Sequence, residues 1–190
     1  MCGIIGYIGK KQPVNFLLEG LKKLEYRGYD SSGIAIKENE NIQIIRSIGR
    51  IKDLENKTKN TKLLNGNIGI GHTRWATHGE PTEENAHPHQ VGNVTLVHNG
   101  IIENAEELRE NLITDGVKFK SETDTEVACA VINKYYDKDP IAAITKALKE
   151  LKGSYAFGII FKDSDKLYAV RKDSPLIIGI GEDENYIASD

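Results

Sequence analysis

Apolar side chains recur at the spacing of an α-helix in several stretches of the chain. The clearest stretch covers residues 13–25, where one valine and four leucines recur every three or four positions behind Pro13, a favourable first-turn residue. Asn104 is followed three positions later by a glutamate, which is the spacing of a capping box and predicts a second helix. Two further helices are predicted to begin at Thr123 and Asp139. One face of each helix should be buried.

Shorter apolar runs predict β-strands. Residues 32–37 and 42–46 are joined by a polar turn and should form an antiparallel hairpin. Residues 67–74 and 94–98 are further strand candidates, and a long polar loop separates them. In the last third of the chain, four short strands are predicted at residues 155–161, 167–170, 176–180 and 186–188. Their connections are only a few residues long, so they permit antiparallel pairing and leave no room for crossover helices.

The hydrophobic pattern also indicates how these elements pack. Residues 155–161 are apolar on both faces of the predicted strand, which should therefore be covered on both sides. Doubly covered antiparallel strands, in a chain that also supplies amphipathic helices, suggest sheets stacked on each other with helices outside. The 190 residues, 39% of them hydrophobic, contain no repeat or flexible linker, and one domain is the simplest interpretation.

Composition excludes several classes of function. The net charge is only -3 and no long run of one sign occurs, so neither nucleic acid nor a membrane surface is an expected partner. No window approaches 18 uninterrupted apolar residues, and the apolar stretch at residues 4–8 is too short for a signal peptide. Two cysteines, Cys2 and Cys129, are too few for a disulfide scaffold, and a reducing, cytoplasmic setting fits best.

Cys2 is a candidate nucleophile because it directly follows Met1. Removal of the initiator methionine would place its thiol, with an ordinary pKa of about 8.5, beside an α-amine with an ordinary pKa of about 7.7 to 8.0. The amine could then accept the thiol proton, directly or through one water, and return it to a leaving group. The plainer alternative is a small buried residue at the start of a strand.

Two other pairs of residues could complete such a site. The Asn99 amide beside the Gly100 N–H could bind an oxyanion, although an Asn-Gly pair more often marks a turn. Asp124, in the first turn after the Thr123 cap, could receive a substrate ammonium, while Arg74 takes the carboxylate of the same amino acid. Helix capping for Asp124 and a surface salt bridge for Arg74 are the plain alternatives.

A metal site and a nucleotide site receive less support. All five histidines fall between His72 and His98, including the pair in His87-Pro88-His89, but their spacing matches no zinc signature. Cys129 lies in a helix predicted to be buried. Two Gly-Ile-Gly runs are too short for a dinucleotide fingerprint, and no phosphate loop is present. No metal or cofactor is expected.

Six motifs in order carry a resemblance to one protein family. They are residues 1–6 (MCGIIG), 24–31 (LEYRGYDS), 72–81 (HTRWATHGEP), 85–89 (NAHPH), 97–104 (VHNGIIEN) and 121–126 (SETDTE). Together they closely resemble the glutaminase domain of the glutamine:fructose-6-phosphate aminotransferases, which are class II glutamine amidotransferases. Sister class II enzymes usually have His-Arg-Gly-Gln at the position of residues 26–29 and lack the tryptophan after Arg74, so the sugar-aminating branch is favoured.

This resemblance implies the fold and the roles of the site residues. The fold would be a four-layer α/β/β/α sandwich of the N-terminal-nucleophile hydrolase type, with stacked, mainly antiparallel sheets. Cys2 would be the nucleophile and its α-amine the base, while the Asn99 side chain and the Gly100 N–H would form the oxyanion hole. Trp75 would be the gate between this site and an ammonia passage. The residues contacting glutamine would be Arg74, Thr77, His78, Gly100 and Asp124.

The resemblance runs over residues 2–190, which would form one glutaminase domain that stops before such domains usually end. The C-terminal sugar-isomerase domains, which bind fructose 6-phosphate, are missing from the sequence. Alone, the chain would hydrolyse L-glutamine to glutamate and ammonia. With those domains, in a cytoplasmic homodimer, the ammonia would convert fructose 6-phosphate to glucosamine 6-phosphate. The alternatives are the glutaminase domain of another class II amidotransferase and a catalytically silent docking or regulatory module.

Overall fold

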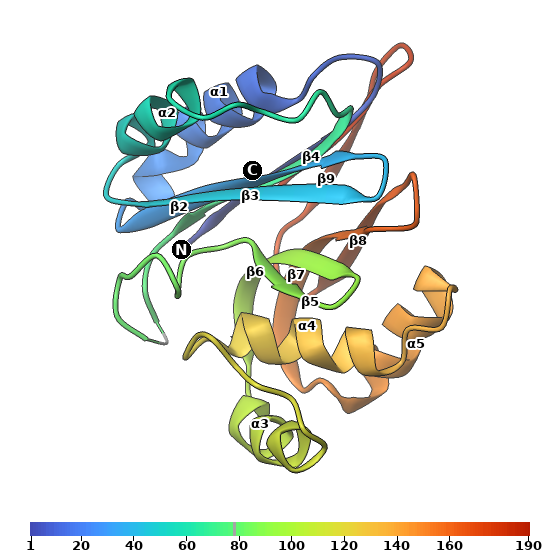
Figure 1. Cartoon of the computed structure of the whole chain (residues 1–190). Helices are drawn as coiled ribbons and strands as arrows, with labels where there is room; N and C mark the ends of the chain where they lie inside the picture. Colours follow the sequence, from blue (N-terminus) through green and yellow to red (C-terminus); the bar gives the residue numbers. More distant parts are fainter. Residues whose placement is uncertain (78) are drawn as a thin grey trace.

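The chain folds into two antiparallel sheets that stack face to face, as the computed structural model shows for residues 1–77 and 79–190 (Figure 1). The larger sheet has the order β3-β2-β4-β1-β10-β9. Its strands are β1 (Gly3–Ile8), β2 (Ser31–Glu38), β3 (Asn41–Ile48), β4 (Ile68–Arg74), β9 (Ile177–Ile180) and β10 (Asn185–Ala188). The smaller sheet has the order β5-β6-β7-β8. Its strands are β5 (His89–Val91), β6 (Val94–Ile102), β7 (Gly153–Phe161) and β8 (Leu167–Lys172).

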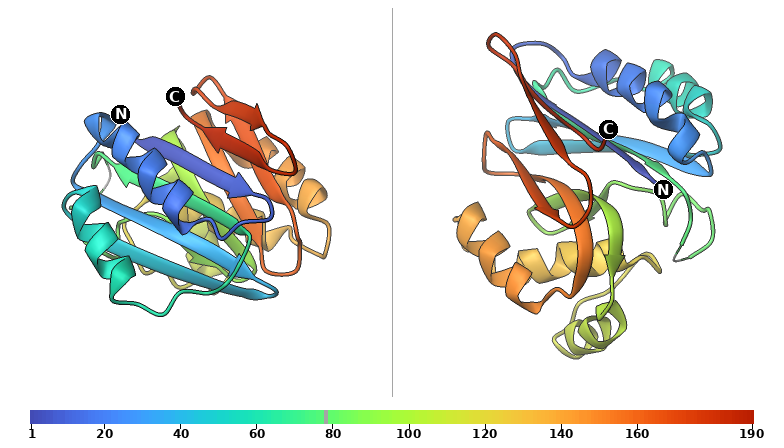
Figure 2. Two further views of the ribbon diagram at one scale, coloured as in Figure 1. Left: turned by 90° about the horizontal axis from the view of Figure 1, so that it is seen from above. Right: turned by 180° about the vertical axis from the view of Figure 1, so that it is seen from behind.

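Helices cover the outer face of each sheet (Figures 1 and 2). The larger sheet carries α1 (Val14–Leu24) and α2 (Ile51–Lys59), and a short 3₁₀ turn, η1 (Glu25–Arg27), follows α1. On the smaller sheet lies α4 (Asp124–Lys134), and α3 (Ala105–Thr114) and α5 (Pro140–Glu150) pack against α4. The predicted four-layer α/β/β/α sandwich is therefore confirmed.

Three apolar layers hold the four structural layers together. Leucines of α1, such as Leu17 and Leu21, pack with isoleucines of the larger sheet, and a second cluster joins the smaller sheet to α3, α4 and α5. The middle cluster, with Ile70 from β4 and Ile160 from β7, lies between the two sheets. Each fully buried side chain of this size contributes about 1.5 to 3 kcal/mol. Residues 155–161 contribute to both the middle and the outer layer, which explains their double-sided apolar pattern.

The strand register brings distant parts of the chain to one place. Gly3 in β1 pairs with Thr73 in β4, so Cys2 lies beside the carboxyl end of β4. β10 pairs with the other edge of β1, and the two chain ends therefore lie close together (Figure 2). The nucleophile candidate is thus placed by a central strand rather than by a loose terminus.

Most predicted elements are present, with some corrections. The hairpin, the strands of the last third and the Thr123 and Asp139 caps are confirmed: Thr123 Oγ1 accepts from the Glu126 N–H at 3.2 Å, and Asp139 Oδ1 accepts from the Ala142 N–H at 3.1 Å. Helix α3 begins directly after Asn104 as predicted, but the capping box is not formed: the Asn104 side chain bonds the Glu150 carbonyl and the Lys152 N–H and so ties α3 to the end of α5.

Helix α2 and strand β5 are among the elements that were not predicted from the sequence. Helix α2 has only Ile51, Leu54 and Thr58 as buried positions in an otherwise charged segment, and carboxylates of Asp53 and Glu25 accept the N–H groups at its start. Strand β5 interrupts the loop that was expected between β4 and β6. In both cases neighbouring elements supply the stabilisation, which local periodicity does not contain.

Candidate active site

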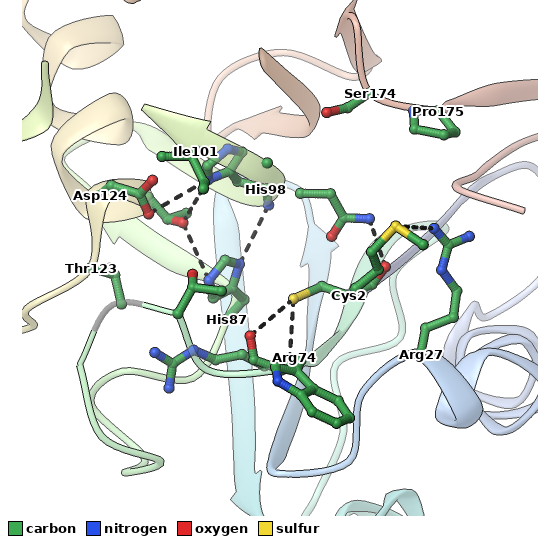
Figure 3. A pocket seen from close by; sticks show the side chains of 16 residues that line it. Cys2, Arg27, Arg74, His87, His98, Ile101, Thr123, Asp124, Ser174 and Pro175 are labelled. Carbon is green, nitrogen blue, oxygen red and sulfur yellow. Dashed lines mark hydrogen bonds and ion pairs between the residues drawn. The ribbon is translucent and has the colours of Figure 1, made fainter. Parts of the chain in front are cut away.

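A cavity of about 270 Å³ opens where β1 begins, β4 ends and α4 begins. It is the meeting point of both sheets (Figure 3). The residues that line it come from seven separate segments of the chain. They are Met1, Cys2, Arg27, Arg74, Trp75, Thr77, His87, His98, Asn99, Gly100, Ile101, Thr123, Asp124, Thr125, Ser174 and Pro175. All sequence-predicted site residues among the described ones therefore line a single cavity; His78 lies outside the described residues.

Cys2 is held by the backbone of Trp75. The Trp75 N–H donates to the Cys2 Sγ at 3.2 Å, and the Cys2 S–H donates to the Trp75 carbonyl oxygen at 3.5 Å. Burial raises the pKa of the Cys2 thiol, and the Trp75 backbone and the positive N-terminus oppose this rise. At neutral pH the sulfur is therefore mainly protonated, and a base must remove its proton before it can attack.

Asn99 and Gly100 lie inside β6 and not in a turn, so that alternative is wrong. The Asn99 Nδ2 donates to the Cys2 carbonyl at 2.9 Å, which places the amide next to the thiol-bearing residue. Gly100 has a φ of +111°, and a Cβ there would lie 2.1 Å from the Ser154 carbonyl oxygen on β7. Only glycine fits this position. The backbone is thus bent at the point where the strand reaches the cavity.

Arg74 ends β4 and is 3% exposed. Arg74 lines the cavity, and its guanidinium donates to the carbonyls of Glu80 and Gly79, each at 3.1 Å. The surface salt bridge considered from the sequence is wrong, because this arginine is buried and holds a loop. Gly28 supports the strand end from behind: a Cβ there would meet the Arg74 backbone at 2.7 Å. Within the motif at residues 24–31, Gly28 therefore allows the chain to pack closely against the Arg74 backbone.

Asp124 occupies the first turn of α4, one residue after the Thr123 cap. Its Oδ2 accepts from the Ile102 N–H at 2.9 Å, and its Oδ1 lies 3.9 Å from the His98 Nδ1. The side chain is buried at the cavity wall, where the helix N-terminus favours a negative charge. Capping is performed by Thr123, so Asp124 is available as an anion facing the cavity.

Trp75 borders two adjacent cavities. It is 49% exposed, lies edge-on to Tyr29 with ring centroids 5.5 Å apart, and lines both the first cavity and a neighbouring one of about 460 Å³. Arg27 and Pro175 also border both cavities. A side chain in this position could control passage between them. Thr77, an exposed residue two positions farther on, lines only the first cavity.

A layer of buried histidines behind the cavity was interpreted from the sequence only as a possible metal site. His72 and His87 stack with ring centroids 3.9 Å apart, and His87 meets His89 edge-on at 5.0 Å. Burial lowers the pKa of His72 to about 3 and holds the pKa values of His87 and His89 well below the ordinary histidine value. Over residues 1–77 and 79–190, no group of three or more His, Cys, Asp or Glu is arranged to hold a metal ion.

Several cavity residues were missed by sequence reasoning. His98, Arg27 and Ser174 line the cavity, and His72 contacts Asn99 from behind. His72 lies two positions before the predicted residue Arg74, and His98 lies directly before the predicted residue Asn99, each within a buried part of its strand. A histidine in a largely apolar strand is the signal that could have identified them, because a fully buried polar ring needs hydrogen-bonding partners.

Among the helices of residues 1–77 and 79–190, none has the length and apolar character of a membrane span.

Comparison with known proteins identifies the family. Residues 72–190 match the family model of a glutamine amidotransferase domain. The whole chain is 55% identical to a glutamine–fructose-6-phosphate aminotransferase (isomerizing) from Clostridium tetani and 47% identical to one from Thermus thermophilus. In each case it covers 32% of the relative, so the chain spans about a third of the length of these relatives.

A solved structure gives the same result for the fold. Glutamine phosphoribosylpyrophosphate amidotransferase from B. subtilis superposes with a TM-score of 0.85 at 29% identity, over 99% of this chain and 42% of that one. A glutamine aminotransferase class-II domain protein from Silicibacter pomeroyi, 16% identical with a TM-score of 0.67, shares the fold over 98% of this chain and 88% of that one. The family-model match, the sequence relatives and the superposition agree, and the chain belongs to the family of glutamine amidotransferase domains.

Proposed function

We propose that this chain hydrolyses L-glutamine to glutamate and ammonia through a thioester on Cys2. The observation that carries the proposal is the convergence of a thiol, an amide donor, a guanidinium and a buried carboxylate on one cavity (Figure 3). Glutamine offers a matching set of groups: an electrophilic side-chain amide at one end, and an α-carboxylate with an α-ammonium at the other. Both ends can be engaged in the same pocket.

The base is the α-amine of Cys2, which exists only after Met1 has been removed. While Met1 is attached, the Cys2 nitrogen belongs to a peptide bond and cannot accept a proton. The raised pKa of the Cys2 thiol makes such a base necessary. In the first step the amine takes the Sγ proton, and the sulfur forms a bond to the side-chain amide carbon of glutamine.

The tetrahedral intermediate carries a negative oxygen, which Asn99 Nδ2 and the Gly100 N–H stabilise. An amide nitrogen has two N–H groups, and the bond from Asn99 to the Cys2 carbonyl occupies one of them. The amine then returns its proton to the leaving nitrogen, the C–N bond breaks, and ammonia departs. Water, deprotonated by the same amine, attacks the thioester carbon; the C–S bond breaks, and glutamate and the thiol are released.

The other end of glutamine is held by charge. Arg74 binds the α-carboxylate and Asp124 the α-ammonium, and Thr77, His78 and Gly100 supply further contacts. The burial of Arg74 and Asp124 supports this assignment, since ion pairs formed away from bulk water are less screened. Trp75 gates the exit of ammonia; its position bordering two adjacent cavities supports this role.

For a longer protein that contains this chain, we propose conversion of fructose 6-phosphate to glucosamine 6-phosphate with the ammonia released here. Residues 2–190 then form its glutaminase domain, and sugar-isomerase domains in a cytoplasmic homodimer bind the sugar phosphate. The relatives at 55% and 47% identity are glutamine–fructose-6-phosphate aminotransferases, which supports this acceptor over phosphoribosyl pyrophosphate, whose amidotransferase is 29% identical.

The test combines mass and activity. Intact mass reports whether Met1 has been removed, and 6-diazo-5-oxo-norleucine, a glutamine-like electrophile, should add one label at Cys2 in the trimmed protein. Cys2→Ala should abolish glutamine-dependent ammonia release. Labelling confined to Cys129 would refute the assignment of Cys2. Absence of glutaminase activity in trimmed protein would instead indicate a silent docking or regulatory module, and ammonia release without amination of fructose 6-phosphate by the longer protein would indicate another acceptor.

A further inference from the structure

The orientation of the Asn99 side chain decides whether the proposed oxyanion hole can work. The two ends of an amide are nearly equal in shape but opposite in hydrogen bonding. With Nδ2 toward Cys2, the group donates to a developing oxyanion; flipped, it would present a carbonyl oxygen that repels the oxyanion. Some neighbour must therefore select one of the two orientations.

His72 is that neighbour. Its Nε2 lies 3.1 Å from the Asn99 Oδ1 and 2.9 Å from the His98 carbonyl oxygen. A carbonyl oxygen only accepts hydrogen bonds, so an Nε2 that contacts it must carry a proton. The same N–H is then shared with the second acceptor, the Asn99 Oδ1. Since this end of the amide faces a donor, its nitrogen is directed to the other side, where it donates to the Cys2 carbonyl.

The protonation state of His72 agrees with this bonding. The ring is fully buried, and burial lowers its pKa to about 3, so it is neutral and carries one proton at physiological pH. Its Nδ1 has no hydrogen-bond partner among the residues that the structure describes. The two nitrogens therefore have different environments, and only Nε2 gains from being protonated.

The position of the ring is fixed by the fold. His72 lies on β4 with Ile4 of β1 and Gly33 of β2 as its pairing partners, whereas Asn99 lies on β6 of the other sheet. Its ring stacks on His87 at an interplanar angle of 13°, and His87 is itself within 3.2 Å of the Thr125 hydroxyl. The contact between His72 and Asn99 thus bridges the two sheets and joins the strand beside Cys2 to the strand of the oxyanion hole.

We propose that His72 is a positioning residue, which holds the Asn99 amide with Nδ2 directed to the reacting carbonyl by donating from Nε2 to Oδ1. The proposal rests on the proposed function, because it takes Asn99 as an oxyanion donor. His72 itself does not touch the substrate. Its effect should therefore fall on the chemical step and not on the binding of glutamine.

A matched pair of variants tests the proposal. His72→Gln places its amide nitrogen near the position of Nε2 and keeps a donor toward Asn99, whereas His72→Asn is shorter and places its amide near Nδ1. We expect His72→Asn to lower kcat for glutamine hydrolysis by about 100-fold, the scale of losing one oxyanion donor. The KM should change little, and His72→Gln should recover most of kcat.

A second readout separates orientation from general damage. Glutamate γ-semialdehyde adds to the Cys2 thiol and places a negative oxygen in the oxyanion hole, whereas glutamate binds without this addition. His72→Asn should weaken inhibition by the aldehyde by about 100-fold and inhibition by glutamate by less than threefold. Equal loss of both, or wild-type kcat in His72→Asn, would overturn the proposal.

Two controls keep the outcomes distinct. Asn99→Ala should lose kcat in the same way; if it is fully active, or if the trimmed wild-type protein has no glutaminase activity, the proposed function fails whatever His72 does. Should the His72 variants not fold, the tautomer can be read in the wild-type protein by ¹⁵N NMR of the imidazole. A proton on Nε2 supports the proposal, and a proton on Nδ1 contradicts it.

Discussion

The backbone of Trp75 contacts the thiol of Cys2 on both sides, with its N–H 3.2 Å and its carbonyl oxygen 3.5 Å from the sulfur. The nucleophile is thereby fastened to the residue that follows Arg74, so the reacting sulfur and the proposed carboxylate clamp are joined through two consecutive residues of the chain. A shift of the end of β4 moves both together. Gly28 packs against the Arg74 backbone at this strand end, and a larger residue there would displace both groups.

The reactivity of Cys2 toward alkylating agents should show its raised pKa. We expect the rate of iodoacetamide labelling at Cys2 in protein that retains Met1 to keep rising with pH beyond the ordinary thiol value of about 8.5. Mass spectrometry after timed labelling between pH 7 and 10 measures this rate. Cys129 is the internal control: it is fully buried, burial raises its pKa, and it should remain unlabelled while the protein is folded. A plateau for Cys2 below pH 8 would contradict the expectation.

Asn85 joins the two arms of the proposed glutamine clamp. Its Nδ2 donates to the Glu80 carbonyl at 3.0 Å, the same carbonyl that accepts from Arg74, and its Oδ1 accepts from the Glu122 N–H at 2.9 Å, just before the start of α4. Asn85→Ala removes both links. We expect the KM for glutamine to rise about tenfold, or about 1.4 kcal/mol, with kcat nearly unchanged, because the binding arms move and the thiol does not.

Steady-state glutaminase assays give both constants for this variant. Asn60→Ala is the matched control, because Asn60 also donates from Nδ2 to a backbone carbonyl, that of Asn56, but does so at the exposed end of α2. It should leave both constants unchanged. A loss of kcat in Asn85→Ala with an unaltered KM would show that Asn85 acts on the nucleophile and not on the clamp.

The sequence predicted the elements that carry their own signal. Helix α1 combines Pro13 with regularly spaced leucines, and α4 has the Thr123 cap, so local propensity and packing agree at both. Helix α2 shows the limit: three buried side chains in a polar segment give little periodicity, and a carboxylate of Glu25, distant in sequence, completes its N-terminus. A contact between residues far apart in the chain cannot be read from a local pattern.

In the candidate site, too, some residues carry a signal in the sequence and others depend on contacts between distant parts of the chain. Cys2, Arg74, Asn99, Gly100 and Asp124 could be nominated because each has a residue type suited to one chemical role, and a single cavity unites them. His72 could not, since its role depends on which side chain of the opposite sheet lies against its Nε2. Similarly, Asn104 has the residue type of a cap, yet the nearby end of α5 supplies stronger partners for its side chain. Residue type predicts capability, and only the packed structure selects among the possible partners.

The buried histidines should make the fold sensitive to acid. His72, His87 and His89 are neutral when folded because burial lowers the pKa of each, to about 3 for His72. In the unfolded chain they titrate near pH 6.5, so below that pH the unfolded state binds protons that the folded state does not. Their contribution to stability is thus fully present above about pH 6.5 and is lost progressively as the pH falls below that value.

The expected loss is about 1.4 kcal/mol per pH unit for each such histidine. Urea unfolding at pH 7.5, 6.5 and 5.5 measures it. The Thr123 hydroxyl lies 3.1 Å from the His89 Nε2, and the glutamine side chain in His89→Gln can keep a hydrogen bond to it. Because this variant has one fewer buried histidine, the unfolded state should bind about one proton fewer on acidification, and the unfolding free energy should depend less steeply on pH. A free energy of unfolding that is independent of pH between 7.5 and 5.5 would contradict the prediction that these histidines are neutral in the folded protein.

Gly100 should be a glycine at which a single added methyl group damages both fold and function. Its φ of +111° disfavours any other residue, and the added Cβ would lie 2.1 Å from the Ser154 carbonyl oxygen, so Gly100→Ala must separate β6 from β7. Gly116 provides a control with φ +94° and no atom within 4 Å of an added Cβ. Gly116→Ala should therefore cost only the backbone strain, about 1 to 2 kcal/mol.

Chemical unfolding of both variants, together with glutaminase assays, distinguishes strain from collision. We expect Gly100→Ala to lose clearly more stability than Gly116→Ala, because it adds a backbone collision to the same kind of strain. We also expect it to lower kcat by at least 100-fold, since its N–H is one of the two proposed oxyanion donors and the bend in β6 aims it. Equal destabilisation of the two variants would show that β6 and β7 yield easily at this point. Retained kcat in a folded Gly100→Ala protein would mean that the backbone at position 100 does not bind the oxyanion.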